Sequence, residues 1–311
     1  MSPLSKAVGE YLTLRRGLGF QLERDGVLLP DFLRFLQREN APYITTDIAV
    51  RWATQPTNAQ AAHWARRLAI VRHFAQYQSA TDPRTEIPPL GVLPHRYHRK
   101  PPYIYRDDEV VRLLQAAGCL RSKRGLRPQT YTTLFGVLAA TGLRVSEGVA
   151  LNREDVDLPE GVVTIHRTKF GKSRLVPLHG STQRVLQAYA RRRDQIVSRP
   201  RAPSFFVSEW GTRLTKWGAE WIFRQLSHQI GLRAPGDRFG PRLHDLRHSF
   251  AVRTLLAWYR TGANVEAHLL DLATYLGHTH VTDTYWYLSA TPELLQLATQ
   301  RLEGPDEGPP S

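Results

Sequence analysis

The sequence predicts a mainly α-helical protein with a small antiparallel β-sheet, built as two domains. Three observations predict this class. Most apolar residues recur at helical spacing. Two short runs rich in β-branched residues, 162–166 and 173–178, flank the glycine-containing stretch 169–172, which is typical of a β-hairpin. A proline-rich segment after residue 90 separates a smaller helical part from a larger second part.

Three helices are expected in the first part of the chain. Apolar residues between 28 and 36 form a helical stripe, which ends before Pro42. A second helix is expected over 46–53 and a third over 58–79. Together they predict an all-α domain over residues 1–90.

The segment 91–102 is expected to be an extended linker. It combines prolines with basic residues and has no periodicity. The second domain is then expected over 103–302. Residues 303–311 are rich in glycine, proline and acidic residues, which predicts a disordered tail.

The second domain is expected to be mostly helical around the predicted hairpin. Acidic residues at 107–109 begin its first helix, where the helix dipole favours negative charge. The apolar stretch 130–140 is too short to cross a membrane and is expected in the core. The expected helices cover 107–117, 130–140, 182–196, 216–230, 246–259, 265–276 and 292–302.

The charge balance is the first indication of function. The 311 residues include 42 Lys and Arg against 28 Asp and Glu, a formal net charge of +14. Such a surplus suits a polyanionic partner such as nucleic acid, although charges scattered over solvated faces would give the same count. Cys119 is the sole cysteine, which excludes a disulfide-stapled scaffold. No signal peptide or membrane span is expected, and the predicted compartment is the cytoplasm.

Polar residues interrupt the apolar pattern of the second domain at several places. Arg144 follows a Thr-Gly break, and Glu147, three residues on, can orient it from the same helix face. The plain alternative is a surface ion pair of little energetic value. His244 and Arg247 lie one helical turn apart, and this pair of donors suits a phosphate.

Two further residues complete the pattern. His278 follows a glycine at the end of a predicted helix, and Tyr287 stands nine residues beyond it. Taken alone, a tyrosine in an aromatic run is most simply a core residue. The significance of these residues therefore lies in their combination.

The order of the motifs is A-T-G-L-R-V-S-E, a lysine-containing hairpin ending R-L-V-P-L, H-x-L-R-H, L-G-H and a later tyrosine. This order resembles the tyrosine recombinase (phage integrase) family, close to its bacterial and phage members, including the Xer type. The resemblance covers about residues 100–300. It implies a helical core-binding domain followed by an α+β catalytic domain.

The resemblance also implies roles for individual residues. Arg144 resembles the first catalytic arginine, and Glu147 the acidic residue that supports it. Lys169 resembles the hairpin lysine, with Lys172 as the competing candidate. His244 and Arg247 resemble the H-x-x-R pair.

The remaining site residues follow from the last two motifs. His278 resembles the next His/Trp position, and Tyr287 resembles the nucleophile. Tyr285 lies two residues from the spacing that the family prefers. His248, directly after the second arginine, is interpreted as structural.

The implied reaction is attack by Tyr287 on a DNA phosphodiester, giving a 3′-phosphotyrosine and a free 5′ hydroxyl. A free tyrosine has a pKa near ~10 and needs a proton acceptor, the role expected of His244. Arg144 and Arg247 would stabilise the phosphate, and Lys169 would protonate the leaving oxygen. Neither a metal nor a nucleotide cofactor is expected, because the sequence has no phosphate-binding glycine loop and no metal-spaced carboxylates.

The expected partner is double-stranded DNA with a specific recombination site. A tetramer is expected on paired sites, with a monomer or dimer free in solution. The C-terminal helix either docks on a neighbouring subunit or packs on its own domain. Candidate contacts to the DNA backbone come from the third helix and the linker: Arg66, Arg67, Arg72, Arg96, Arg99 and Lys100.

Two alternatives stay open at this point. One is strand cleavage and religation of the type IB topoisomerase kind. The other is a catalytically silent DNA-binding protein on the same fold.

Overall fold

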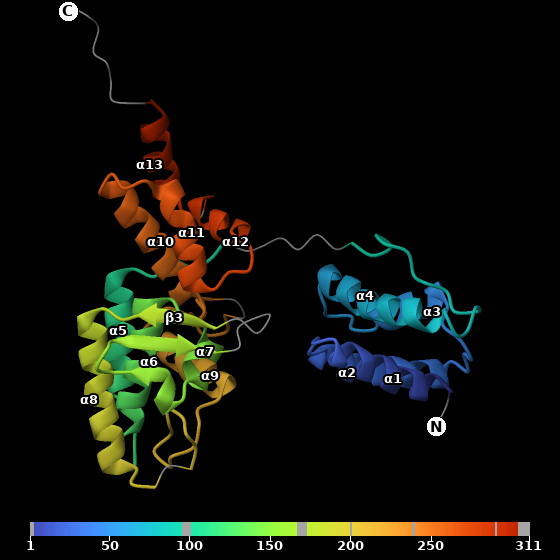
Figure 1. Ribbon diagram of the computed structural model, residues 1–311, viewed down its shortest axis with the longest axis horizontal. Helices are drawn as coiled ribbons and strands as arrows, with labels where there is room; N and C mark the ends of the chain where they lie inside the picture. Colours follow the sequence, from blue (N-terminus) through green and yellow to red (C-terminus); the bar gives the residue numbers. More distant parts are fainter. Residues whose placement is uncertain are drawn as a thin grey trace, which may run out of the picture. The chain divides into compact units, whose positions relative to one another are not determined.

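The chain divides into two compact units, Met1–Lys100 and Pro101–Ser311 (Figure 1). The structure, a computed structural model, describes residues 3–94, 101–166, 173–199, 201–237, 240–289 and 291–303. The predicted tail, apart from Glu303, and the predicted linker residues 95–100 lie outside these ranges.

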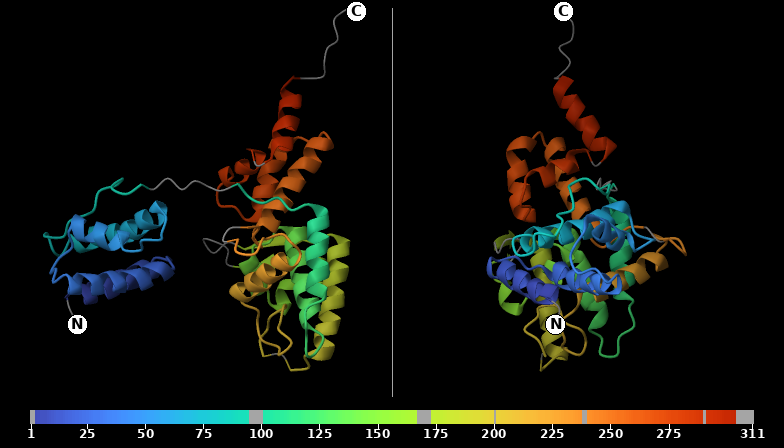
Figure 2. Two further views of the ribbon diagram at one scale, coloured as in Figure 1. Left: turned by 180° about the vertical axis from the view of Figure 1, so that it is seen from behind. Right: turned by 90° about the vertical axis from the view of Figure 1, so that its right-hand side faces the viewer.

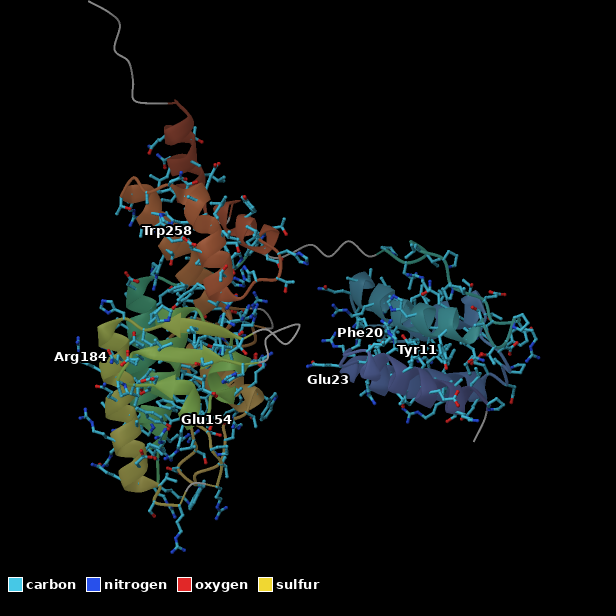
Figure 3. All side chains as sticks on the ribbon, in the orientation of Figure 1. Tyr11, Phe20, Glu23, Glu154, Arg184 and Trp258 are labelled. Atoms are coloured by element: carbon cyan, nitrogen blue, oxygen red, sulfur yellow. The ribbon has the colours of Figure 1, made fainter. Side chains whose placement is uncertain are left out.

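The first unit is a bundle of four helices: α1 (Pro3–Gly17), α2 (Glu23–Arg38), α3 (Thr46–Thr54) and α4 (Ala61–Gln78). Its core holds large buried side chains, among them Phe32, Trp52 and Phe74. Tyr11 of α1, which Figure 3 labels, packs edge-on against Phe74 of α4, with 5.6 Å between ring centroids. The predicted helices correspond to α2, α3 and α4. The helix α1 is not among them, although its buried residues Val8, Tyr11 and Leu12 stand at helical spacing.

The second unit is built on an antiparallel sheet of three strands in the order β1-β2-β3. The strands are β1 (Val156–Asp157), β2 (Val162–Ile165) and β3 (Arg174–Pro177). Val163 of β2 pairs with Val176 of β3, and both are fully buried in the main core. The predicted hairpin is therefore present, while its connecting residues 167–172 lie outside the described ranges.

Helices cover this sheet and extend the unit. They are α5 (Asp107–Gly118), α6 (Arg127–Thr141), α7 (Val145–Ala150), η1 (Arg153–Asp155), α8 (Gly180–Ile196), α9 (Lys216–Gln229), α10 (Asp245–Arg260), α11 (Val265–Leu276), α12 (Thr282–Tyr285), η2 (Trp286–Ser289) and α13 (Pro292–Glu303). α6 lies centrally and packs against α5, α8 and α10. The helix expected to begin near Arg144 corresponds to α7. The short elements η1, β1, α12 and η2 are not predicted, because so few residues carry no readable periodicity.

The helices α10 to α13 gather at one end of the second unit, and α13 lies farthest from the sheet (Figures 1 and 2). They share a smaller core that contains Leu255, Leu276, Tyr287 and Leu294. α13 packs against α10 and η2 of its own chain, with Leu294 fully buried. The prediction of a mainly helical protein with a small antiparallel sheet is confirmed. Among the described helices, none has the length and apolar character needed to cross a bilayer.

Candidate active site

The candidate residues meet where two helices end. Gly142 directly follows α6 and Gly277 directly follows α11, and both glycines have left-handed backbone, with φ of 63° and 68°. A side chain at Gly142 would also collide with Phe250, because its Cβ would stand 2.6 Å from a ring carbon. A Cβ at Gly277 would likewise stand 2.7 Å from Nη1 of Arg174. Both positions therefore favour glycine, by backbone conformation and by space.

Arg247 on α10 joins the two helix ends. Its Nη1 donates to the carbonyl of Gly142 at 2.8 Å, and its Nη2 donates to the carbonyl of Leu276 at 2.6 Å. The side chain is 2 % exposed. Burial, together with the nearby charge of Arg144, lowers the pKa of Arg247 to about 10, so the guanidinium stays positive at neutral pH.

Arg144 approaches the same place from the N-terminus of α7. Its Nη1 donates to Glu147 Oε1 at 2.7 Å, and its Nη2 donates to the carbonyl of Gly277 at 3.0 Å. The backbone N–H of Arg144 donates to the other carboxylate oxygen of Glu147 at 2.9 Å. One carboxylate and one carbonyl thus hold the Arg144 guanidinium in a single orientation.

Glu147 is shared with a third arginine. Arg174 of β3 donates through Nη1 and Nη2 to the two oxygens of Glu147, at 3.1 and 2.9 Å, and through Nε to the carbonyl of Tyr275 at 2.8 Å. Burial disfavours the charged carboxylate, but the bonds and charges of Arg174 and Arg144 outweigh it and lower the pKa of Glu147 to about 2. Glu147 is therefore ionised and links two cationic side chains.

Tyr287 lies in η2 and is 2 % exposed. Its hydroxyl oxygen is 2.9 Å from Nδ1 of His248. Its ring stacks on the ring of His278, with 6.2 Å between centroids. The positive charge of Arg247 is close enough to interact with a phenolate at this position. Tyr285, the neighbouring candidate, is half exposed.

The two other predicted histidines also lie in this region. His278 hydrogen-bonds through Nδ1 with the hydroxyl of Thr284 at 2.7 Å, which fixes its ring. His244 packs edge-on against His248, with 4.9 Å between ring centroids. Burial, followed by the proximity of His248, lowers the pKa of His244 to about 4, so its ring is neutral at physiological pH.

Other predicted residues fall outside this cluster. Lys169, Lys172, Arg96, Arg99 and Lys100 lie outside the described residues.

Three predicted DNA contacts belong to α4 of the first unit. Arg66 is exposed, and Arg72 donates to the carbonyls of Pro88 and Pro89. Arg67 departs from its prediction as a DNA contact. It is 7 % exposed, and its guanidinium lies 3.8 Å from the ring centroid of Trp52. We therefore assign Arg67 to the core of its unit.

Arg174 and His248 are the two residues whose place in the site the sequence did not reveal. Arg174 was visible only as the first letter of R-L-V-P-L, a charged residue at the start of a strand. His248 was visible beside Arg247 but was interpreted as structural. In both cases the contact joins distant parts of the chain, 27 positions apart for Arg174 and Glu147 and 39 for His248 and Tyr287.

Several known proteins are similar to this chain in sequence or in fold. The model of the phage integrase family matches residues 104–293. The putative integrase/recombinase y4rB of Sinorhizobium fredii (strain NBRC 101917 / NGR234) is 49 % identical over 307 residues, covering 97 % of this chain and 98 % of that protein. Tyrosine recombinase XerD of Oceanobacillus iheyensis is 31 % identical, covering 75 % and 72 %.

Among solved structures, the Tn1549 transposon integrase in complex with transposon right end DNA superposes with a TM-score of 0.65. The match covers 96 % of this chain and 99 % of that one, at 16 % identity. At this identity, the likeness concerns the fold.

Proposed function

The chain belongs to the phage integrase family of tyrosine recombinases, and on that premise we propose that Tyr287 is the nucleophile with which it cleaves DNA. It is a site-specific recombinase, an enzyme that breaks and rejoins DNA strands. One observation carries the proposal for the site. Three consecutive residues contact three candidates: Leu276 contacts Arg247, Gly277 contacts Arg144, and His278 stacks on Tyr287.

The proposed chemistry follows from this convergence. A phosphodiester placed between the guanidinium groups of Arg144 and Arg247 would have its non-bridging oxygens stabilised by two fixed positive charges. The Tyr287 oxygen forms a bond to phosphorus while the bond from phosphorus to the 5′ oxygen breaks. The product is a 3′-phosphotyrosine and a 5′ hydroxyl, and we assign protonation of that oxygen to Lys169.

Religation reverses this step. The phosphotyrosine bond keeps the free energy of the phosphodiester, so a 5′ hydroxyl from the same or another duplex can attack it. Exchange between two duplexes cleaves four strands in all, one for each active site. We therefore propose a tetramer on paired DNA sites.

We assign DNA binding to the domain of residues 1–90 and catalysis to the domain of residues 103–302. Residues 91–102 are the proposed linker between them. Arg66 is the exposed arginine of α4 that we assign to the DNA backbone. The proposed compartment is the cytoplasm, where its DNA substrate would be found.

The test is covalent capture of DNA. The probe is a pool of duplexes with randomised arms and nicks at several positions in the central segment. Cleavage close to a nick releases a short 5′-hydroxyl strand, which prevents religation. Protein–DNA complexes that survive denaturing detergent are then recovered and sequenced.

We expect wild type to capture DNA, Tyr287→Phe to capture none while still binding it, and Tyr285→Phe to capture DNA normally. Loss of capture in Tyr285→Phe with retention in Tyr287→Phe would overturn the assignment of the nucleophile. Binding without capture by wild type would favour a catalytically silent DNA-binding protein.

A further inference from the structure

His248 contacts the atom that reacts in the proposed function. Its Nδ1 lies 2.9 Å from the hydroxyl oxygen of Tyr287, and the two residues are 8 % and 2 % exposed. We propose that His248 accepts the proton of Tyr287 during cleavage and returns it during religation. This inference rests on the proposed function, and it replaces His244 in the role that the sequence suggested.

The distance and the surroundings suit proton transfer. A phenol that donates to Nδ1 needs the neutral imidazole to carry its proton on Nε2. On that side lies Oδ1 of Asp245, 3.9 Å from Nε2 and nearly fully buried. Asp245 also binds Arg242 at 2.8 Å, which holds its carboxylate in place. A buried carboxylate at this distance stabilises the imidazolium that forms once Nδ1 takes a proton.

The charged and titratable groups around the pair fit the same role. Directly before α10, His244 packs against His248 and is neutral, so it adds no second positive charge. Arg247 and His278 lie on the Tyr287 side, and a positive Arg247 favours the phenolate as it forms. His244 thus supports the His248 ring, whereas the nitrogen of His248 meets the phenol.

The proposed step is balanced. The oxygen of Tyr287 bonds to phosphorus as the bond to the 5′ oxygen breaks. The phenol proton moves to Nδ1 of His248, and the 5′ oxygen takes a proton from Lys169, the proposed acid. In religation each proton returns, so no proton is consumed over the full cycle.

The first measurement is the rate of covalent capture with a nicked duplex recovered from the randomised pool. Removal of a general base costs on the order of 100-fold or more in rate, and this loss is expected for His248→Gln and His248→Asn. His248→Asn is the sharper variant, because its amide can accept a hydrogen bond from Tyr287 but cannot take the proton. If His248→Asn captures DNA at the wild-type rate, His248 only orients the phenol and the proposal is wrong.

The second measurement separates this role from support of the fold. A duplex with a 3′-p-nitrophenyl phosphate next to a 5′-hydroxyl strand is ligated without a tyrosine. The 5′ oxygen attacks phosphorus, the bond to p-nitrophenolate breaks, and that leaving group needs no proton. We expect His248→Asn and Tyr287→Phe to keep this ligation, and Arg247→Lys to lose both reactions.

Each remaining outcome is decisive. If His248→Asn loses ligation together with capture, its role is structural and the proposal is overturned. If wild type captures no DNA from the pool, the proposed function fails. If wild type and the His248 variants capture equally well, only the present inference fails.

Discussion

Glu147 provides a quantitative test of how the arginines are held. Glu147→Gln keeps the shape of the side chain but removes the negative charge between Arg144 and Arg174. Lowering the pKa of this carboxyl from its ordinary 4.5 to about 2 corresponds to roughly 3 kcal/mol of folding free energy at pH 7. We expect the variant to be less stable by about that amount.

The pH dependence has a definite sign. Because the folded-state pKa lies below the unfolded-state value, the stabilisation is complete above about pH 5 and is lost as the pH falls toward 2. At pH 3 the difference in free energy of unfolding between wild type and Glu147→Gln is expected to shrink to roughly 1 kcal/mol. Wild type and Glu147→Gln should therefore have more similar free energies of unfolding at acidic pH.

The assay is hydrogen exchange of α6 peptides at increasing urea, which reports unfolding of the second unit alone. Glu154→Gln is the matched control, because Glu154 is an exposed carboxylate of the same unit (Figure 3). Glu154→Gln is expected to change the free energy of unfolding by no more than about 0.5 kcal/mol. A difference between wild type and Glu147→Gln that stays constant from pH 7 to pH 3 would refute the reasoning.

Three further predictions concern Gly277 beside the site and two arginines of the first unit. Gly277→Ala places its Cβ 2.7 Å from Nη1 of Arg174, whereas Gly262→Ala meets nothing although its φ is also positive. By the same exchange assay, Gly277→Ala should lower the free energy of unfolding by about 2 kcal/mol more than Gly262→Ala, because Arg174 must give up charge-assisted hydrogen bonds. Equal losses of stability in the two variants would contradict this. Arg66→Gln should reduce the slope of log binding constant against log salt by about 1, measured on the recovered duplex. Arg67→Met should leave that slope unchanged and instead destabilise the first unit by about 2 kcal/mol, and a reduced slope would show that Arg67 reaches DNA.

Contacts between neighbours in sequence were predictable. The three-residue spacing of Arg144 and Glu147 predicts an ion pair, and the two side chains meet at 2.7 Å. The glycine at 277 predicts a helix end, and α11 ends there. In these cases the geometry of a single helix or turn fixes the contact.

Contacts that depend on tertiary folding were not predictable. Arg174 reaches Glu147 only because the register of β3 brings it beside α7. His248 reaches Tyr287 only because η2 folds back onto α10. The burial of Arg67 escaped prediction for a related reason, since the spacing of basic residues on α4 does not show which of them faces Trp52.

The C-terminal ends of α6 and α11 lie close together and both contact Arg247. Each helix presents partial negative charge at its C-terminal carbonyls, and two such ends placed together repel one another. Arg247, between Gly142 and Leu276, is the cation that allows them to meet. The positive charge proposed to bind a phosphate thus also holds the two helix ends together. A lysine has one compact ammonium group and would not replace both of these hydrogen bonds in the same geometry. Replacement of Arg247 should therefore change the packing of the two helix ends together with the reaction.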